Sequence, residues 1–436
     1  MEALYHYLWK HRMFGNTILS TTGKEIEIVN PGLHNLDAGP DFSAAVIRTD
    51  EMEWGGNVEI HVKASDWKKH GHHTNPAYDT VILHIVGIDD EKVCRTDGTD
   101  ILQACVAPPA EFFNRYVILT EKIDTPTCLP WINTIPTLNK ADWVSSLGLE
   151  RLQQKADYMM QVLKSGNGNW QQTLFIILAR AMGFGLNGVP FEMLAKSLPL
   201  NFVMRHRDNP NQIEALVFGQ AGMLEAGFYA YDEYYQTLCR EYGFLSKKYS
   251  LTPLDPTVWK YSRTRPGNFP HRRIALLSAM LADGMQLYSD ILEAAGDYNR
   301  LMDCLDFRAS SYWLHHTRFG QPESEVPIAS TLSRSSKEII LINVMAPFYY
   351  AYGAFTGNSE MAEKGQDLLR DLNAEKNSIL NLWQNHGLKA TTAFESQALL
   401  QLRKNYCDRS RCLECRFGHY LLRATVAAKR DRTIHI

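Results

Sequence analysis

The pattern of apolar and polar positions changes once along the chain. Up to residue 107, apolar residues alternate with polar ones in short runs separated by turn residues, which is typical of β-strands. Beyond Pro108-Pro109, apolar residues recur every three or four positions over longer segments, which predicts helices. We therefore expect an α+β protein in which a strand-rich part precedes a helical part.

The strand-rich part begins with a predicted amphipathic helix, because Leu4, Leu8 and Trp9 share one helical face within residues 1–14. Strands predicted from the alternating runs span residues 17–21, 25–29, 42–48, 53–62, 80–88, 92–95 and 101–106. Several of these runs are joined by tight turns, so we expect a mixed sheet with mostly antiparallel pairs.

Three parts follow from these elements: an α+β sheet domain over 1–107, a proline-containing linker over 108–135 and a helical domain over 136–436. The helices predicted in the last part span about 138–164, 170–183, 190–198, 212–222, 229–247, 269–284, 336–353, 359–372, 378–383 and 392–404. No convincing fixed-period repeat accompanies them.

Composition narrows the class of protein. With 45% hydrophobic and 21% charged residues the chain resembles an ordinary globular protein, and a net charge of -3 gives no global attraction to nucleic acid. Any nucleic-acid binding must therefore depend on local patches. The sequence also lacks a signal-peptide pattern and an apolar run long enough to span a bilayer, so we expect a cytoplasmic protein without a membrane partner.

Two predicted strands carry acids. Asp41 follows a Gly-Pro turn, and Glu59 lies in a strand on which Glu59, His61 and Lys63 share one face. Packed strands seldom tolerate such groups without a partner. This face is therefore either a solvated, salt-bridged surface or, if Asp41 lies opposite, a site for a divalent metal and proton transfer.

These acids resemble the signature of the PD-(D/E)XK nuclease superfamily, a Pro-Asp on one strand and an Asp/Glu-x-Lys on the next. Pro40-Asp41 matches the first part, and Glu59-Ile60-His61 matches the second with His in place of Lys. The resemblance implies a restriction-endonuclease-like core in which Asp41 and Glu59 bind Mg²⁺ or Mn²⁺. It also implies that His61 or Lys63 assists the attacking water.

In that superfamily a helix before the sheet commonly supplies another acid, for which Glu2 is the candidate, and His34 is a further supporting residue. A neutral His both donates and accepts hydrogen bonds, whereas Lys only donates. The substitution at position 61 therefore indicates an altered mechanism or a domain that binds without cutting.

Over most of its length the chain also resembles a bacterial family catalogued as a domain of unknown function. The runs that carry this resemblance are 39–45, 56–67, 78–86, 265–275 and 412–415. The resemblance implies no activity.

Histidines gather after the second acidic strand: His70, His72 and His73 lie in a predicted loop, and His84 lies in the next strand. Imidazoles this close can bind zinc or another transition metal together with Glu59, which would suit a hydrolase of other substrates. Their spacing matches no standard zinc motif. The pattern favours a surface loop that supports the acidic pair. It makes His61 and His84, which lie on predicted strands, stronger candidates for site residues than the loop histidines.

The carboxy-terminal region contains metal-like spacing, Cys407-x4-Cys412-x2-Cys415-x3-His419. These four residues would complete a zinc site. With Cys128 as the fourth ligand, the same thiols would hold an iron–sulfur cluster. The remaining interpretation is three buried thiols in a reduced protein.

A basic segment in which arginines are interleaved with aromatic residues spans 260–273. It is either a platform for phosphate or single-stranded nucleic acid, or a structural loop whose arginines pair with helix carboxylates. The residues that would contact nucleic acid are Arg263, Arg265, Asn268, Arg272 and Arg273.

Taken together, these features predict a metal-dependent nuclease that hydrolyses phosphodiester bonds. The rival hypothesis is a non-catalytic scaffold whose degenerate nuclease-like domain binds nucleic acid or a protein. The sequence contains no phosphate-binding loop of the GxxxxGK[ST] type and no GxSxG elbow, so neither an NTPase of that type nor a serine hydrolase is expected.

Overall fold

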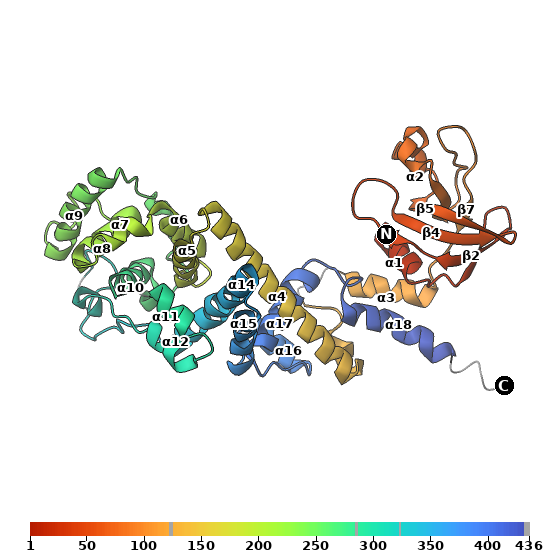
Figure 1. Ribbon diagram of the computed structural model, residues 1–436. Helices are drawn as coiled ribbons and strands as arrows, with labels where there is room; N and C mark the ends of the chain where they lie inside the picture. Colours follow the sequence, from red (N-terminus) through yellow and green to blue (C-terminus); the bar gives the residue numbers. More distant parts are fainter. Residues whose placement is uncertain (122–124, 284–286, 322–323, 431–436) are drawn as a thin grey trace. The chain divides into compact units, whose positions relative to one another are not determined.

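In the computed structural model, which describes residues 1–121, 125–283, 287–321 and 324–430, the chain forms two compact units. One unit combines Met1–Trp143 with the segment from Arg403 onward, and the other is Val144–Leu402 (Figure 1). The end of the predicted helical domain, 136–436, thus belongs to the unit that contains the sheet.

The first unit is built on a mixed, curled β-sheet (Figure 1). Among the described residues its order is β1-β2-β4-β5-β6-β7, with β3 pairing with β4. The strands are β1 (Thr17–Leu19), β2 (Glu25–Asn30), β3 (Leu33–His34), β4 (Phe42–Thr49), β5 (Met52–Lys63), β6 (Val81–Ile88) and β7 (Gln103–Cys105). The pairs up to β4–β5 are antiparallel, whereas β5, β6 and β7 run parallel.

This architecture confirms the predicted fold class, a mixed sheet domain followed by helices. The strand predicted over 92–95 is wrong, since only an isolated bridge joins Cys94 to Asp100. The turn between these residues, closed by a hydrogen bond from Arg95 to Thr99, leaves the segment too short to extend the sheet.

Both faces of the central strand β5 are covered. Val58 and Ile60 belong to the apolar cluster that includes Trp9 of α1 (Glu2–Lys10). On the alternate positions, Glu59 is 4% and His61 is 1% exposed. The interpretation of this stripe as a solvated surface is therefore wrong, and its ionisable groups need partners inside the protein.

The segment that connects β5 to β6 covers the face of β5 that carries Glu59 and His61. It contains α2 (Asp66–Lys69) and the 3₁₀ turns η1 (His72–Thr74) and η2 (Pro76–Tyr78), anchored by the buried rings of Trp67 and Tyr78. Gly71 adopts a left-handed conformation, φ +77°, which is readily accessible to glycine. The chain reverses there, so His72 is buried instead of lying in the expected surface loop.

The helices of the first unit flank a cysteine-containing segment. They are α3 (Ala110–Thr120), the 3₁₀ turn η3 (Leu129–Thr134), the beginning of α4 (Thr137–Ser165), the π-helical turn η8 (Leu402–Cys407) and α18 (Arg416–Arg430). Helices α3 and α18 lie side by side, and Arg115 donates to the carbonyl of Leu421 at 2.9 Å. The predicted linker, 108–135, is thus partly helical.

The second unit is helical and has one large apolar core. Its helices after α4 are α5 (Trp170–Met182), α6 (Gly188–Ser197), α7 (Leu200–Met204), α8 (Pro210–Gln220), α9 (Glu233–Tyr249), α10 (Pro270–Asp283), α11 (Leu287–Glu293), α12 (Tyr298–Cys304), α13 (Arg334–Ile340), α14 (Ala346–Thr356), α15 (Ser359–Asp371), α16 (Ser378–Asn385) and α17 (Ala393–Gln401). A π-helical turn, η7 (Leu341–Met345), joins α13 to α14. Gly284, the predicted end of one helix, lies outside the described residues.

Among the described residues, the stretch Arg334–Thr356 is long and apolar enough to cross a membrane by length and composition. The expectation that no such run exists is therefore wrong. In its most apolar window 61% of the stretch is buried within the protein, including Met345 and Tyr349. Apolarity on all sides is what a core helix requires.

Candidate functional site

Asp41 and Glu59 meet where β4 begins beside β5. The N–H of Asp41 donates to Glu59 Oε2 at 3.0 Å, and the N–H of Ile60 donates to Asp41 Oδ2 at 2.9 Å. The pairing of Phe42 with Val58 sets this register. Each carboxylate is thus held by the neighbouring strand, and the two acids predicted from the sequence lie together.

Helix α1 adds two more groups. His6 Nε2 lies 3.2 Å from Asp41 Oδ2, and ligand atoms of Glu2, His6 and Asp41 all lie within 4.8 Å of one another. Burial disfavours the charged imidazole, but interaction with Asp41 and nearby acids outweighs this effect and raises the pKa of His6. Glu2 was predicted. His6 was missed, although its i,i+4 spacing from Glu2 was a usable signal.

A second group of ligands lies on the other side of Glu59. Glu59 Oε1 is 3.1 Å from His72 Nε2 and 3.5 Å from His61 Nε2. Ligand atoms of His61, His70 and His72 all lie within 4.8 Å of one another. Since Glu59 Oε2 accepts from the N–H of Asp41, this one carboxylate has an oxygen directed toward each group.

A buried hydrogen-bond chain orients His61. Gln103 Nε2 donates to Asp89 Oδ1 at 2.5 Å, so Gln103 Oε1 accepts from His84 Nδ1 at 2.9 Å. In a neutral His84 the Nε2 atom is then an acceptor, and it receives the proton on His61 Nδ1 at 2.9 Å. His61 Nε2 consequently presents a lone pair toward His70 and Glu59, as a metal ligand does.

Burial sets the charge of these groups. It raises the pKa of Glu59, although His72 acts in the opposite direction. Burial, followed by the neighbouring imidazoles, lowers the pKa of His61 to about 2, and burial lowers the pKa of His84 to about 4. Both rings are therefore neutral near pH 7, which is the form of imidazole that binds metals.

A cavity of about 740 Å³ opens beside His6. It is lined by α1, α3, His34 and the segment 410–419, all in the first unit. Its wall contains Lys10, Arg411 and Arg416, together with three histidines whose pKa is lowered mainly by burial, His11, His34 and His419. The two arginines also pair with Glu414 and Asp142. The cavity thus has a mixed polar wall and reaches His6, whose Nε2 atom contacts Asp41.

Two predicted residues do not join this arrangement. Lys63 is exposed at the end of β5, where its backbone N–H donates to Asp66 Oδ2 at 3.3 Å. His73 is half-buried, and it is not part of either ligand group among the described residues. The assisting role implied for position 63 therefore has no support from geometry.

The structure separates the predicted zinc ligands. Cys128, Cys407, Cys412 and Cys415 lie near one another. The Nδ1 atom of His419 bonds to Tyr7 Oη at 2.5 Å and its ring meets that of His11 at 4.7 Å between centroids, and neither close ligand group among the described residues contains it. The structure therefore brings Cys128, the fourth residue of the predicted iron–sulfur set, near the three cysteines.

The predicted nucleic-acid contacts in the second unit divide into two kinds. Arg272, 3% exposed, donates to the carbonyls of His316 and Ala329 at 3.1 and 2.6 Å, and Arg273, 7% exposed, bonds to Asn268 and covers the ring of Phe184. These two arginines are structural, and their prediction as nucleic-acid contacts is corrected, because buried guanidinium groups cannot reach a phosphate.

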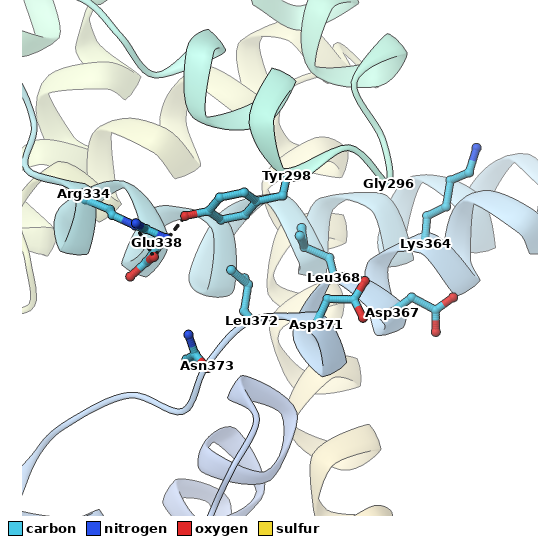
Figure 2. Close-up of a pocket in the computed structure, with 10 residues that line it drawn as sticks. All are labelled: Gly296, Tyr298, Arg334, Glu338, Lys364, Asp367, Leu368, Asp371, Leu372 and Asn373. Atoms are coloured by element: carbon cyan, nitrogen blue, oxygen red, sulfur yellow. Dashed lines mark hydrogen bonds and ion pairs between the residues drawn. The ribbon is translucent and has the colours of Figure 1, made fainter.

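The exposed members of that set, Arg263 and Arg265, line a cavity of about 260 Å³ with Asn268. A larger cavity in the same unit, about 470 Å³, is drawn in Figure 2. There the Tyr298 hydroxyl and the Arg334 guanidinium both donate to Glu338, at 3.0 and 3.1 Å. Glu338 is thus already paired, and neither of the two close ligand groups found among the described residues lies in this cavity.

The chain belongs to the family described as protein of unknown function (DUF2851), whose model matches residues 2–378. The resemblance to a family of unknown function is thereby confirmed. No curated protein and no solved structure matches the chain. The family match includes both ligand groups around Glu59 and ends before Cys407.

Proposed function

We propose that this member of a family of unknown function is a metal-dependent phosphodiesterase that acts on nucleic acid, with its active site around Glu59. One observation carries the proposal: the buried Glu59 carboxylate directs one oxygen toward Asp41 and the other toward His61 and His72. Buried carboxylates and neutral imidazoles with free lone pairs are typical of a metal centre.

The two ligand groups differ in chemistry. Glu2 and Asp41 offer oxygen atoms, which Mg²⁺ and Mn²⁺ prefer, whereas His61, His70 and His72 offer nitrogen atoms that suit zinc, manganese or iron. Glu59 is available to both groups. A bound divalent metal would lower the pKa of a water molecule and stabilise the negative charge of the reacting phosphate.

The resemblance to PD-(D/E)XK nucleases supports the reaction type. Asp41 immediately precedes β4, Glu59 lies on the adjacent strand β5, and Glu2 lies on the helix before them, which is compatible with the resemblance. The position of the usual Lys is occupied by His61, whose Nδ1–H is already donated to His84. We infer that His61 binds metal or accepts a proton, instead of holding water as a cation would.

The cavity beside His6 supports the substrate class. Its wall contains Lys10, Arg411 and Arg416, and a phosphate backbone is attracted to clustered lysines and arginines. Because the overall charge is -3, this local clustering is what would bring a polyanion to the site.

The test compares cleavage of DNA and RNA, single- and double-stranded, by the full chain with Mg²⁺, Mn²⁺ or Zn²⁺. Asp41→Asn and Glu59→Gln each keep an oxygen that can accept the neighbouring N–H, so the fold should persist. We expect both variants to lose cleavage at least about 100-fold, in line with removal of transition-state charge stabilisation. Asp37→Asn, which changes an exposed acid in the same loop, should cleave like the wild type.

Equal cleavage by wild type, Asp41→Asn and Glu59→Gln would overturn the proposal. So would metal-independent binding of nucleic acid without cleavage, which is the behaviour of the rival scaffold. Calorimetric titration with Mn²⁺ provides the second readout, because the same two variants should bind the metal more weakly than Asp37→Asn does.

A further inference from the structure

Four cysteines from separate segments converge in the first unit. Cys128 precedes η3, Cys407 ends η8, Cys412 lies in the following loop, and Cys415 immediately precedes α18. All six pairs of these thiols are close enough to interact electrostatically. Because 278 residues separate the first cysteine from the second, this convergence is a product of the fold.

The backbone of the loop is shaped to hold these side chains. Ser410 has a left-handed conformation, φ +53°, and its N–H donates to the carbonyl of Cys407 at 3.0 Å. A Cβ atom on Gly418 would lie 2.1 Å from the carbonyl oxygen of Cys412, so only glycine fits there. Cys128, Cys407 and Cys412 line one cavity of about 330 Å³ together with Arg403.

Trp143 supplies an independent observation at this site. The residue is 6% exposed, and its Nε1 atom is buried without a hydrogen-bond partner. The Cys415 thiol lies beside this indole N–H. Tyr406 holds the ring edge-on at 5.3 Å, and the Arg416 guanidinium covers it at 5.1 Å. A buried N–H donor without a partner is destabilising, and a negatively charged sulfur ligand would satisfy it.

The spacing of the sulfurs distinguishes between metals. Zinc–sulfur bonds of about 2.3 Å in a tetrahedron place the sulfurs about 3.8 Å apart. Among the described residues, the two sets of three ligand atoms within 4.8 Å of one another contain no cysteine. The four sulfurs are therefore spread more widely than one zinc ion requires, and a cluster with several metal atoms suits such a frame.

We propose that Cys128, Cys407, Cys412 and Cys415 bind an iron–sulfur cluster, and that Trp143 donates a hydrogen bond to the Cys415 sulfur. The four thiols lose their protons when they bind the cluster. This proposal is independent of the phosphodiesterase activity, because none of these residues belongs to the ligand groups around Glu59.

The test is anaerobic purification of the full chain and reconstitution with iron and sulfide. We expect visible absorbance with roughly four irons and four sulfides per chain, as for a Cys-ligated [4Fe–4S] cluster. Cys128→Ser and Cys407→Ser should each lose most of the iron and the absorbance. Cys239→Ser and Cys304→Ser, which change half-buried thiols of the second unit, should keep both.

Trp143→Phe keeps the ring but removes the N–H donor. We expect this variant to retain the cluster with a more negative midpoint potential, since hydrogen bonds to the sulfurs favour the reduced state. Stoichiometric zinc without absorbance, absence of any bound metal, or full cluster content in Cys128→Ser would overturn the proposal. Asp41→Asn should keep its cluster, so failure of the phosphodiesterase proposal would leave this result unchanged.

Discussion

At the scale of single residues, the chemistry of the site depends on which nitrogen of His61 carries the proton. The chain from Asp89 through Gln103 and His84 determines this, and it leaves a lone pair on His61 Nε2, which lies 3.2 Å from His70 Nδ1. Gln103 thus orients a proposed metal ligand without belonging to either ligand group, an arrangement that is common in metal sites.

Replacing Gln103 by Met should therefore weaken metal binding by about 10–100-fold, because the orienting hydrogen bonds are lost. Isothermal titration with Mn²⁺ measures this effect. Gln220→Met is the matched control, since Gln220 is also a buried amide but lies in the second unit. Equal Mn²⁺ affinity in the two variants would contradict the proposed role of Gln103.

Only part of this site could be predicted from the sequence. The register of two neighbouring strands brings Asp41 to Glu59, and alternation places His61 beside them, so local patterns were sufficient. The sequence favours a surface loop for His72, because the left-handed conformation of Gly71 is not revealed by residue spacing. Gln103 has no sequence signal, since its role exists only after β7 pairs with β6.

At the scale of elements, the helical unit depends on close approach of helices at glycines. A Cβ atom on Gly365 of α15 would lie 2.5 Å from the carbonyl oxygen of Ala346 and 2.9 Å from the nitrogen of Tyr350 in α14. These are backbone atoms, which cannot move aside as a flexible side chain can. The two helices can pack at this distance only because the residue has no side chain.

We expect Gly365→Ala to destabilise the protein by about 1–3 kcal/mol through overpacking. Gly243→Ala, within α9, should instead stabilise it by up to about 1 kcal/mol, because a Cβ atom there meets nothing within 4 Å and Ala favours the helix. Urea unfolding measures both changes. A loss of stability in Gly243→Ala, or none in Gly365→Ala, would contradict the packing described.

Where a segment was long, the helix predicted from the spacing of its apolar residues lies close to the observed helix. The predicted helix over 170–183 corresponds to α5, and the predicted helix over 336–353 corresponds to α13, η7 and α14. The π-helical turn was not predicted. It directly precedes α14, whose second residue, Pro347, has no N–H to donate to the preceding turn. Helix α3 lies in the segment predicted as a linker. The prolines on either side of it favour a break in regular structure, so the sequence pattern does not reveal this helix.

At the scale of the molecule, the sheet-containing unit is completed by a segment that follows the helical unit in sequence. Phe417, Leu421 and Leu422 of α18 are buried, and Tyr7 of α1 contacts both Phe112 of α3 and His419 of α18. Sequence patterns could not predict this packing, because apolar periodicity locates a helix or strand but does not identify the element that it packs against.

A chain truncated after Leu402 should therefore keep its helical unit but lose stability in the first unit. Burying three large apolar side chains contributes about 5 kcal/mol or more, and the truncation removes this contribution. Hydrogen exchange should become faster in α1 and α3 and stay unchanged in α5 and α8, which serve as the internal reference. Unchanged exchange in α3 would contradict this assignment of the carboxy-terminal segment.

The divided first unit also constrains how the protein forms in the cell. A ribosome that has passed Trp143 must still synthesise the whole helical unit before Arg403 and the cysteines after it emerge, which takes roughly 13–50 s at typical elongation rates. During that interval α3 has not yet met α18, and Cys128 has not yet met the three later cysteines. We therefore expect the nascent sheet-containing unit to remain incomplete, with apolar surface exposed, until the segment from Arg403 has been synthesised.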